Sequence, residues 1–431
     1  MKRLASIHRK ILVTTLLCLG FCAASCSAPP KLDLEPGDHV VIIGNTLAER
    51  TQYFGHFETF LHARFPKHQL VVRNQGYSGD EVAFRPRLLN FGNTDHHLTM
   101  SEADVVIAFL GFNESFRGEK GLTEFRAQLE EFIGHIRSQK YNGKTTPRLA
   151  LISPIAHENL GNANYPDGSE SNPNLKLYTQ AMAEVADEQG VPFADLFTTS
   201  SEMMRTSTEP LTINGIHLTD SGYAKLAPIL DEALFGSPRG QDRISEQLRT
   251  EVNEKNLFYF HRYRAVNGYY IYGGRSRRDH GNPPYTDAYV LENERGKLDD
   301  MVANRDERIW RVAQGLSVPF EIDDRNTRPH YKVPTNFQQP IRILSPQESK
   351  KHFKLAEGYA INLFASEDEF PELKNPVQMN FDSKGRLWVL IMPDYPMFLP
   401  PAKPNDKLLV LEDETADGKA DKLTVFFDGL H

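Results

Sequence analysis

Four short segments in the first half of the chain carry hydroxyl, amide and imidazole groups that could act together in acyl transfer. They are Ile43–Ala48, Asn74–Asp80, Leu110–Glu114 and Asn214–Leu218, the last followed by Ser221-Gly222-Tyr223. Acyl transfer needs a nucleophile, a base and hydrogen-bond donors for the oxyanion. We therefore expect Thr46 to attack, His217 to act as the base, and the N–H groups of Thr46 and Gly79 with the amide of Asn113 to form an oxyanion hole. Gly79 suits that place because a residue without Cβ lets the backbone approach a substrate closely.

The first three segments directly follow apolar runs that are typical of buried strands. Runs rich in Val, Ile and Leu without alternation indicate strands that are covered on both faces. Polar, helix-like stretches separate them, and this alternation predicts a doubly wound parallel α/β sheet between residues 38 and 236, with functional residues at the carboxyl ends of its strands. The predicted strands are Val40–Ile43, Leu70–Val72, Val105–Leu110, Leu149–Ile152 and Val191–Leu196, and the predicted helices are Leu47–Phe65, Gly121–Gln139 and Leu175–Gln189.

These four segments, in this order, resemble those of the SGNH or GDSL-like esterases and lipases. The resemblance implies a flavodoxin-like three-layer fold and hydrolysis of a carboxylic ester, with an O-acyl group on a carbohydrate as the expected substrate. The family has serine where this chain has Thr46, and aspartate where it has Asn214 and Glu114. A threonine methyl group restricts the hydroxyl, and a neutral amide orients an imidazole without stabilising its charged form. A catalytically degenerate domain that binds glycan or assists a sugar oxidoreductase is therefore the alternative.

Other interpretations of these residues remain open at this point. Thr46 could instead be the N-cap of the helix that follows it, and Asn113 could simply tie loops together. A further carboxylate, Asp195 or Asp220, could assist His217 in place of an aspartate at position 214. Ser78 is a rival hydroxyl and His157 a second histidine that follows a strand, whereas Glu49 and Arg50 fit an exposed helical pair.

The N-terminus predicts export and a lipid anchor. Basic residues precede an apolar stretch that ends in Ala23-Ala24-Ser25-Cys26, which resembles a bacterial lipobox, so residues 1–26 are expected to be a signal peptide with Cys26 lipidated. A tether over residues 27–37 would follow, and the protein would face the periplasm or the outside, attached to a membrane. The other cysteines, Cys18 and Cys22, also lie in this leader. The net charge of −8 argues against a nucleic-acid partner.

The second half predicts three further segments. Residues 237–316 form an aromatic and helical extension with a helix over Asp287–Gln314, and residues 317–346 form a proline-containing linker. Residues 347–431 resemble the start of the β-propeller in large exported planctomycete proteins, although haem is not supported because no Cys-x-x-Cys-His segment is present. No cofactor is expected for the hydrolase domain. An alternation of oxygen-bearing side chains resembles a weak calcium loop, with a polar hairpin turn as the alternative. Its residues are Asp413, Thr415, Asp417 and Asp421.

Overall fold

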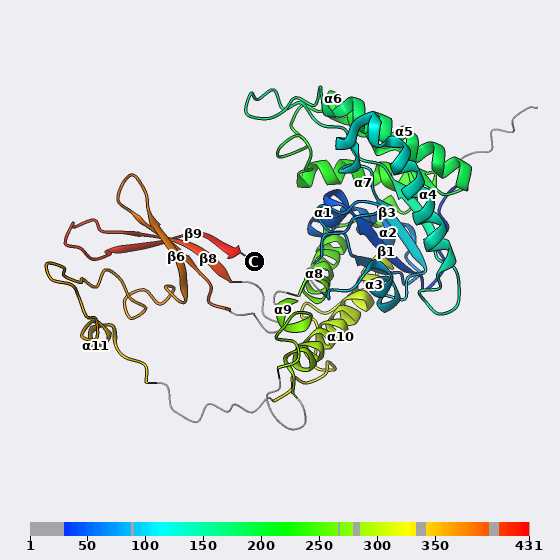
Figure 1. Cartoon of the computed structure of the whole chain (residues 1–431). Coiled ribbons are helices and arrows are strands. Elements are labelled where there is room, and N and C mark those ends of the chain that lie inside the picture. The colour runs from blue at the N-terminus through cyan, green and yellow to red at the C-terminus, as the bar shows by residue number, and fades with distance from the viewer. Residues whose placement is uncertain are drawn as a thin grey trace, which may run out of the picture.

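The computed structural model describes residues 30–87, 90–265, 268–278, 285–332, 342–395 and 405–430 (Figure 1). The predicted signal peptide and Cys26 lie outside these residues. Within the described ranges, no helix is long and apolar enough to cross a membrane.

A five-stranded parallel sheet forms the centre of the first unit. Its strands lie in the order β2-β1-β3-β4-β5, which confirms the predicted doubly wound parallel sheet. In this order the chain reverses direction across the sheet between β1 and β3, where ligand sites of such folds lie. The strands are β1 (His39–Gly44), β2 (Val71–Asn74), β3 (Val105–Phe109), β4 (Arg148–Ile152) and β5 (Phe193–Ala194).

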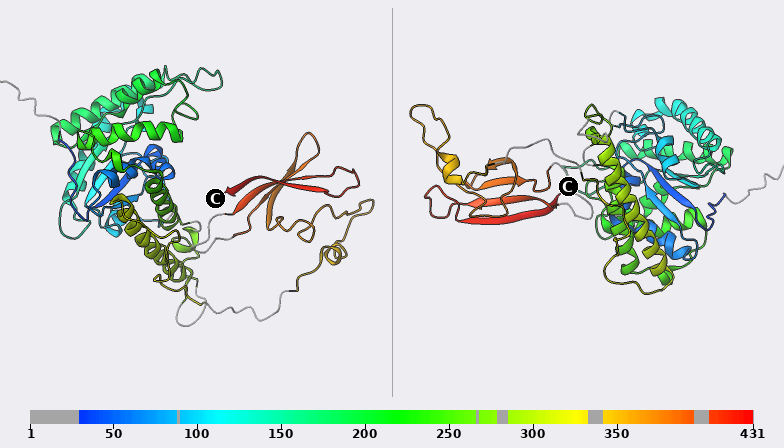
Figure 2. Two further views of the ribbon diagram at one scale, coloured as in Figure 1. Left: turned by 180° about the vertical axis from the view of Figure 1, so that it is seen from behind. Right: turned by 90° about the horizontal axis from the view of Figure 1, so that it is seen from below.

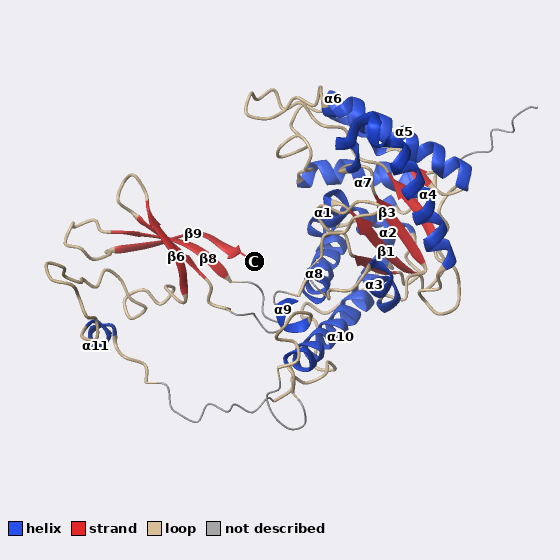
Figure 3. Cartoon of the chain, viewed as in Figure 1, coloured by secondary structure: helices blue, strands red, loops and turns tan. Residues whose placement is uncertain are grey.

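Helices cover both faces of this sheet, as Figure 3 shows. Alternate residues of β1 point to opposite faces, so Val40 and Ile42 belong to one hydrophobic cluster and Val41 and Ile43 to another. The first cluster includes residues of α1, α2, α6 and α7, and the second includes residues of α3, α4 and α5. These helices are α1 (Thr46–Phe54), α2 (His56–Arg64), α3 (Thr94–Met100), α4 (Leu122–Ser138), α5 (Ser171–Gln189), α6 (Leu196–Thr206) and α7 (Asp220–Phe235), and a 3-10 segment, η1 (Glu114–Gly121), precedes α4.

The predicted helix over Leu47–Phe65 is wrong in one respect, because it is two helices. Gly55 between α1 and α2 adopts a left-handed conformation with φ of 68°. A Cβ at this position would also lie 2.2 Å from Oδ1 of Asn253 in α8 (Glu246–Tyr263), so a larger residue here would displace that side chain. The sequence predicted the helical residues but not the break.

The helical extension packs against the edge of the sheet at β2. It contains a short 3-10 turn, η2 (Gln241–Arg243), and three helices, α8 (Glu246–Tyr263), α9 (Gly268–Ile271) and α10 (Asp287–Ala313). Helices α8 and α10 lie side by side in both views of Figure 2 and are in extensive contact. Nζ of Lys255 donates to the carbonyl of Val72, and Nε1 of Trp310 donates to that of Leu70. The extension therefore satisfies backbone acceptors near an edge strand that would otherwise be open.

The first part of the predicted linker is held against α10. Arg305 of α10 pairs with Asp324 at 3.1 Å, and Arg328 pairs with Asp300 of α10 at 2.7 Å. Residues 317–328 thus continue the packed extension, although the prolines of residues 317–346 favour a linker in the sequence.

The C-terminal residues form a separate four-stranded antiparallel sheet in the order β6-β7-β8-β9. In the hydrophobic core of this sheet, Val389 of β7 and Leu409 of β8 belong to one buried cluster, and the partly buried Phe364 packs against it. The β-structure expected for this region is confirmed, and a propeller stays a prediction. The elements are a short helix, α11 (Pro346–Lys350), and the strands β6 (Pro376–Phe381), β7 (Leu387–Ile391), β8 (Asp406–Glu412) and β9 (Lys422–Leu430).

Candidate active site

The chain turns sharply from β1 into α1, and this turn presents Thr46. Gly44 has φ of 122°, and a Cβ there would lie 2.0 Å from the carbonyl oxygen of Phe109 on β3, so only glycine fits. Asn45 is the N-cap of α1, since its Oδ1 accepts a hydrogen bond from Leu47 N at 3.1 Å. The alternative that Thr46 caps the helix is therefore wrong. Thr46 is the first residue of α1, and neither its N–H nor its hydroxyl has a hydrogen-bond partner among the described residues.

The loop after β2 carries Gly79 in the left-handed conformation, with φ of 87°. A Cβ at Gly79 would lie 3.5 Å from the nearest side-chain atom, so the backbone conformation, rather than crowding, explains glycine here. Ser78 donates from both its N–H and its hydroxyl to the same carboxylate oxygen of Glu49, at 2.6 and 2.5 Å. No partner for the Gly79 N–H is found in the described part of the chain.

The loop after β3 is held by Glu114, which is fully buried. Its carboxylate accepts from the N–H of Val82 at 2.8 Å and from that of Gly111 at 3.1 Å, and burial raises the pKa of Glu114. Glu114 thus links this loop to the one that carries Gly79. The adjacent Asn113 is half-buried, and its side-chain amide makes no hydrogen bond to any described residue. The role of tying the loops together therefore belongs to Glu114.

The loop that carries His217 is fixed by a buried carboxylate that the sequence did not single out. Glu158 accepts from the N–H groups of Leu211 and Thr212 and from the Thr212 hydroxyl, at 2.6 to 3.1 Å. Thr212 Oγ1 in turn accepts from the N–H of Gly215 at 2.9 Å. Glu158 lies 53 residues before Leu211, so local spacing could not reveal the pairing.

His217 is a half-buried imidazole that contacts Asn214. Its Nδ1 lies 2.9 Å from Nδ2 and 3.0 Å from Oδ1 of Asn214, and Oδ1 also accepts the backbone N–H of His217 at 3.0 Å. Burial and the nearby guanidinium of Arg50 lower the pKa of His217, which favours the neutral ring. Its Nε2 has no partner within the described ranges, which leaves that nitrogen available as a base when the proton is on Nδ1.

Neither of the two carboxylates proposed to assist His217 contacts it. Asp195 caps α6 through the N–H of Thr198, and Asp220 pairs with His56 at 2.7 Å. Asn214 is therefore the side chain that orients His217 in the part of the chain described.

The loops of Thr46 and His217 meet at the start of α1. Nη2 of Arg50 donates to the carbonyl of Leu218 at 3.3 Å, and the Tyr223 hydroxyl donates to the carbonyl of Leu47 at 3.0 Å. Together with the adjacent strands β2, β1 and β3, this arrangement gathers all four predicted segments at one edge of the sheet. No hydrogen bond joins the Thr46 hydroxyl to His217 among the described residues.

The structure also places three further residues that the sequence singled out. Glu49 is buried and Arg50 half-buried, so they are not an exposed pair: Glu49 holds the Gly79 loop, and Arg50 lies beside His217. His157 lies next to the His217 loop, because a Cβ on Gly215 would be 2.4 Å from its Nε2, and its Nδ1 contacts the Ser171 hydroxyl.

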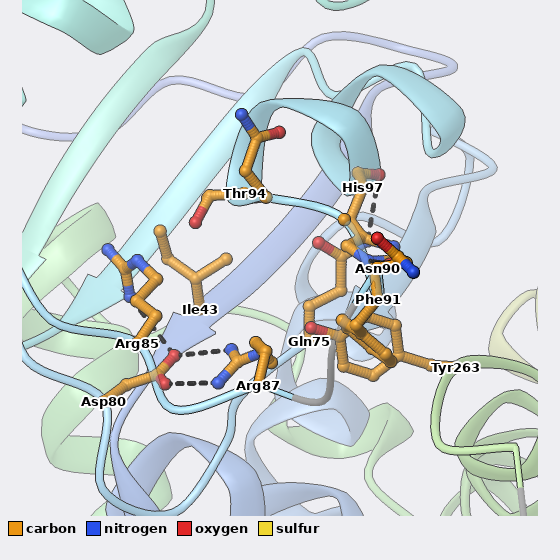
Figure 4. Close-up of a pocket in the computed structure, with 12 residues that line it drawn as sticks. Ile43, Gln75, Asp80, Arg85, Arg87, Asn90, Phe91, Thr94, His97 and Tyr263 are labelled. Atoms are coloured by element: carbon orange, nitrogen blue, oxygen red, sulfur yellow. Dashed lines mark hydrogen bonds and ion pairs between the residues drawn. The ribbon is translucent and has the colours of Figure 1, made fainter. Parts of the chain in front are cut away.

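A cavity of about 360 Å³ lies beside the Gly79 loop (Figure 4). Asp80, the residue after Gly79, pairs in its wall with Arg85 at 3.2 Å and with Arg87 at 2.6 Å. Amide and aromatic side chains complete the lining, among them Gln75 and Tyr263. The cavity therefore offers polar donors and acceptors next to planar rings.

The predicted calcium loop is a self-contained turn. The Asp413 carboxylate accepts from the N–H groups of Asp417 and Gly418, and Asp421 accepts from the N–H and hydroxyl of Thr415. Within the described ranges, no group of three or more His, Cys, Asp or Glu side chains is arranged to hold a metal ion. These contacts are those of a polar turn, and calcium binding by the loop stays a prediction.

Comparisons with known proteins match the two halves separately. Residues 42–225 match the model of the GDSL-like lipase/acylhydrolase family, and residues 345–431 match a domain of unknown function (DUF7133). No curated protein matches the chain significantly.

Several solved structures are similar over about half of this chain. A catalytic mutant of an acetylxylan esterase from Geobacillus stearothermophilus is 17% identical, with a TM-score of 0.36, over 47% of this chain and 96% of the other. An α/β hydrolase from the metagenome of Lake Arreo, Spain, is 18% identical, with a TM-score of 0.37 and the same coverage. A putative GDSL-like lipase from Parabacteroides merdae is 16% identical, with a TM-score of 0.38, over 48% of this chain and 99% of the other.

The family match covers the sheet and all four segments that carry Thr46, Gly79, Asn113 and His217. The chain therefore contains a GDSL-like lipase/acylhydrolase domain, followed by a helical segment and a C-terminal domain of unknown function.

Proposed function

We propose that this protein hydrolyses a carboxylic ester, with an O-acyl group on a carbohydrate as the substrate class. The observation that supports this proposal is a set of three hydrogen-bond donors that have no acceptor among the described residues. In loops whose other polar groups are extensively bonded, the N–H groups of Thr46 and Gly79 and the amide of Asn113 remain free in the described part of the chain. They follow three adjacent strands, as donors to one oxyanion would.

In this proposal, Oγ1 of Thr46 attacks the ester carbonyl while Nε2 of His217 takes the hydroxyl proton. The three donors hold the negative oxygen of the tetrahedral intermediate, which then expels the alcohol, and His217 returns the proton to that alcohol. A water molecule, activated by the same nitrogen, then releases the acid and regenerates Thr46. Asn214 orients the ring throughout.

The carbohydrate part of the proposal is supported by the cavity beside the Gly79 loop. Its guanidinium, amide and aromatic groups are suited to a ligand rich in hydroxyl groups. Asp80 in the wall of this cavity directly follows the proposed oxyanion residue Gly79.

The test is turnover of p-nitrophenyl acetate and of acetylated xylo-oligosaccharides by the full chain. We expect activity that His217→Ala and Thr46→Val abolish, since valine keeps the branched shape of threonine but lacks the hydroxyl. Ser78→Ala is the matched control for the rival hydroxyl and should retain most of the activity. Turnover by the wild type that does not exceed that of His217→Ala would refute hydrolysis.

A second function, glycan binding by a degenerate site, is favoured by one specific contact. Nδ2 of Asn214 lies 2.9 Å from Nδ1 of His217, and an amide that donates to Nδ1 would leave the proton on Nε2, where it blocks the base. This alternative predicts no turnover but saturable binding of the same oligosaccharides, measured by calorimetry.

We also propose that the protein is exported and attached to a membrane through a lipid on Cys26. The supporting observation is the lipobox-like end of the apolar leader. Cys26→Ala should move the protein from the membrane fraction to the soluble fraction, whereas Cys22→Ala should not. Retention of the Cys26→Ala variant in the membrane fraction would contradict the anchor.

A further inference from the structure

Arg264 lies just beyond α8, outside the residues that match the family, yet it contacts the loop that carries Gly79. Its guanidinium carbon is 3.4 Å from the centroid of the Tyr77 ring. Its Nη2 donates to Oε1 of Glu49 at 3.2 Å, and its Nη1 approaches the carbonyl oxygen of Gly76 at 3.5 Å. One arginine of the extension thus contacts a ring, a carboxylate and a carbonyl of the site.

A second arginine also lies over the same ring. The guanidinium carbon of Arg87 is 3.9 Å from the centroid of Tyr77, and Arg87 is itself fixed by two hydrogen bonds to Asp80, at 2.6 and 2.9 Å. Figure 4 shows this pairing of Arg87 with Asp80. Two cation–π contacts therefore hold Tyr77, only two residues before Gly79.

Glu49 connects Arg264 to the backbone next to Gly79. One of its oxygens accepts from the N–H and hydroxyl of Ser78, and the other accepts from Arg264 and from the hydroxyl of Tyr53. Glu49 is only 6% exposed, so its charge needs a partner. The positively charged guanidinium of Arg264 is that partner, with its Nη2 at 3.2 Å from Oε1 of Glu49.

We propose that Arg264 is a positioning residue through which the helical extension clamps the loop of Tyr77, Ser78 and Gly79. The clamp would hold the Gly79 N–H in the direction that the oxyanion requires. Such a donor contributes to catalysis only when it is already oriented before the reaction. This inference rests on the proposed function for its catalytic consequence, but the clamp itself can be measured without activity.

A guanidinium is suited to this place, and an ammonium is not. Arg264 uses its planar face against Tyr77 and its edge toward Glu49 and Gly76, a combination that the single ammonium of lysine cannot reproduce. Arg264→Lys would keep the charge near Glu49 and lose the stacked contact, so it should give an intermediate effect.

The test combines hydrogen exchange with kinetics on the full chain. In Arg264→Met we expect at least tenfold faster exchange at the N–H of Ser78, which donates to Glu49, and a 10- to 100-fold lower kcat on p-nitrophenyl acetate with a smaller change in KM. Arg275→Met is the matched control, because Arg275 lies over Tyr270 at 4.5 Å within the extension. It should leave both quantities unchanged.

Three results separate the clamp from the proposed activity. Unchanged exchange at Ser78 in Arg264→Met would overturn the clamp, and faster exchange with an unchanged kcat would overturn its role in positioning the oxyanion donor. Faster exchange in a protein whose wild type shows no turnover would support the clamp and overturn only the hydrolase proposal. If Arg264→Met does not fold, the same comparison is made with Arg264→Lys, where an exchange rate equal to that of the wild type refutes the stacking argument.

Discussion

Replacing Asn214 with aspartate is the perturbation that most directly tests the site. The amide contacts Nδ1 of His217 through both of its atoms, Nδ2 at 2.9 Å and Oδ1 at 3.0 Å. Two arrangements therefore compete: Nδ1–H can donate to Oδ1, or the amide can donate to an unprotonated Nδ1. Only the first leaves Nε2 free to accept a proton from Thr46. Aspartate has no donor when ionised, so Asn214→Asp enforces the productive arrangement.

The size of the expected gain in kcat follows from the same distances between Asn214 and His217. A carboxylate about 3 Å from the imidazolium that forms during the reaction would attract it by about 5–6 kcal/mol at an effective dielectric constant of about 20. This agrees with the roughly 10⁴-fold loss in kcat when the triad aspartate of a serine protease becomes asparagine, which is about 5.5 kcal/mol. Because His217 is only half-buried, solvent weakens the attraction. We therefore expect a gain in kcat on the order of 10²- to 10⁴-fold.

The assay is the kcat and KM of p-nitrophenyl acetate hydrolysis as a function of pH, for the wild type, Asn214→Asp, His217→Ala and the double variant. The gain should appear in kcat, because the imidazolium forms only in the transition state. It should disappear when His217 is alanine. The acidic limb of the pH profile should also move to higher pH, since a carboxylate raises the pKa of a neighbouring imidazole.

Two results would refute this reasoning. An Asn214→Asp variant no faster than the wild type would show that the orientation of His217 does not limit the reaction. A gain that persists in the His217→Ala background would show that the new carboxylate acts by itself. Nitrogen-15 NMR of the His217 ring gives an independent check, because the proton should be on Nδ1 in the variant.

Three further predictions follow from the contacts. Arg50→Met should move the acidic limb of kcat/KM to higher pH, because Arg50 lowers the pKa of His217 and activity falls as pH drops through that pKa. An unchanged limb in the pH profile would contradict this. Glu58→Gln should reduce the free energy of unfolding in urea by about 3–5 kcal/mol at pH 7, because buried Lys255 loses its partner at 2.7 Å. The Lys255 charge and other contacts lower the pKa of Glu58 to about 2, so this stabilisation is present above the ordinary pKa near 4.5 and is lost as pH falls toward 2, where the difference between wild type and variant should vanish. Gly55→Ala should cost about 1–3 kcal/mol in the same urea experiment, because φ is 68° at that position.

The sequence predicted the strands and the four segments because buried parallel strands leave a local signal. The run Val105–Leu110 agrees with β3 to within one residue, and the predicted helix over Asp287–Gln314 ends one residue beyond α10. Since the carboxyl ends of parallel strands share one edge, the placement of Thr46, Gly79 and Asn113 near that edge follows from topology alone.

The sequence could not reveal partners that are distant along the chain. Glu49 has the spacing of an exposed helical residue, but it contacts Ser78 and Arg264, which lie 29 and 215 residues away. The role of Glu158 likewise depends on a loop 53 residues later. Burial of a charged side chain is decided by such contacts, and no local pattern records them.

The buried carboxylates bear on the choice between an active and a degenerate site. Glu49, Glu114 and Glu158 each lie below a tenth of their full exposure, and each accepts backbone N–H groups from a loop that carries a proposed catalytic group. Burying a carboxylate is costly unless hydrogen bonds offset it, and a loop that only packs against its neighbours could be held by apolar side chains instead.

Between these held loops, the donors on Thr46, Gly79 and Asn113 remain free in the described residues. The proposed function interprets these three unsatisfied donors as the place that receives a developing negative charge. Thr46 and Asn214 differ from the serine and aspartate of the family, and these differences concern the proposed nucleophile and the orientation of the proposed base. They do not change the three free donors. On this argument, Thr46→Ser with Asn214→Asp should raise the rate of a competent but attenuated site.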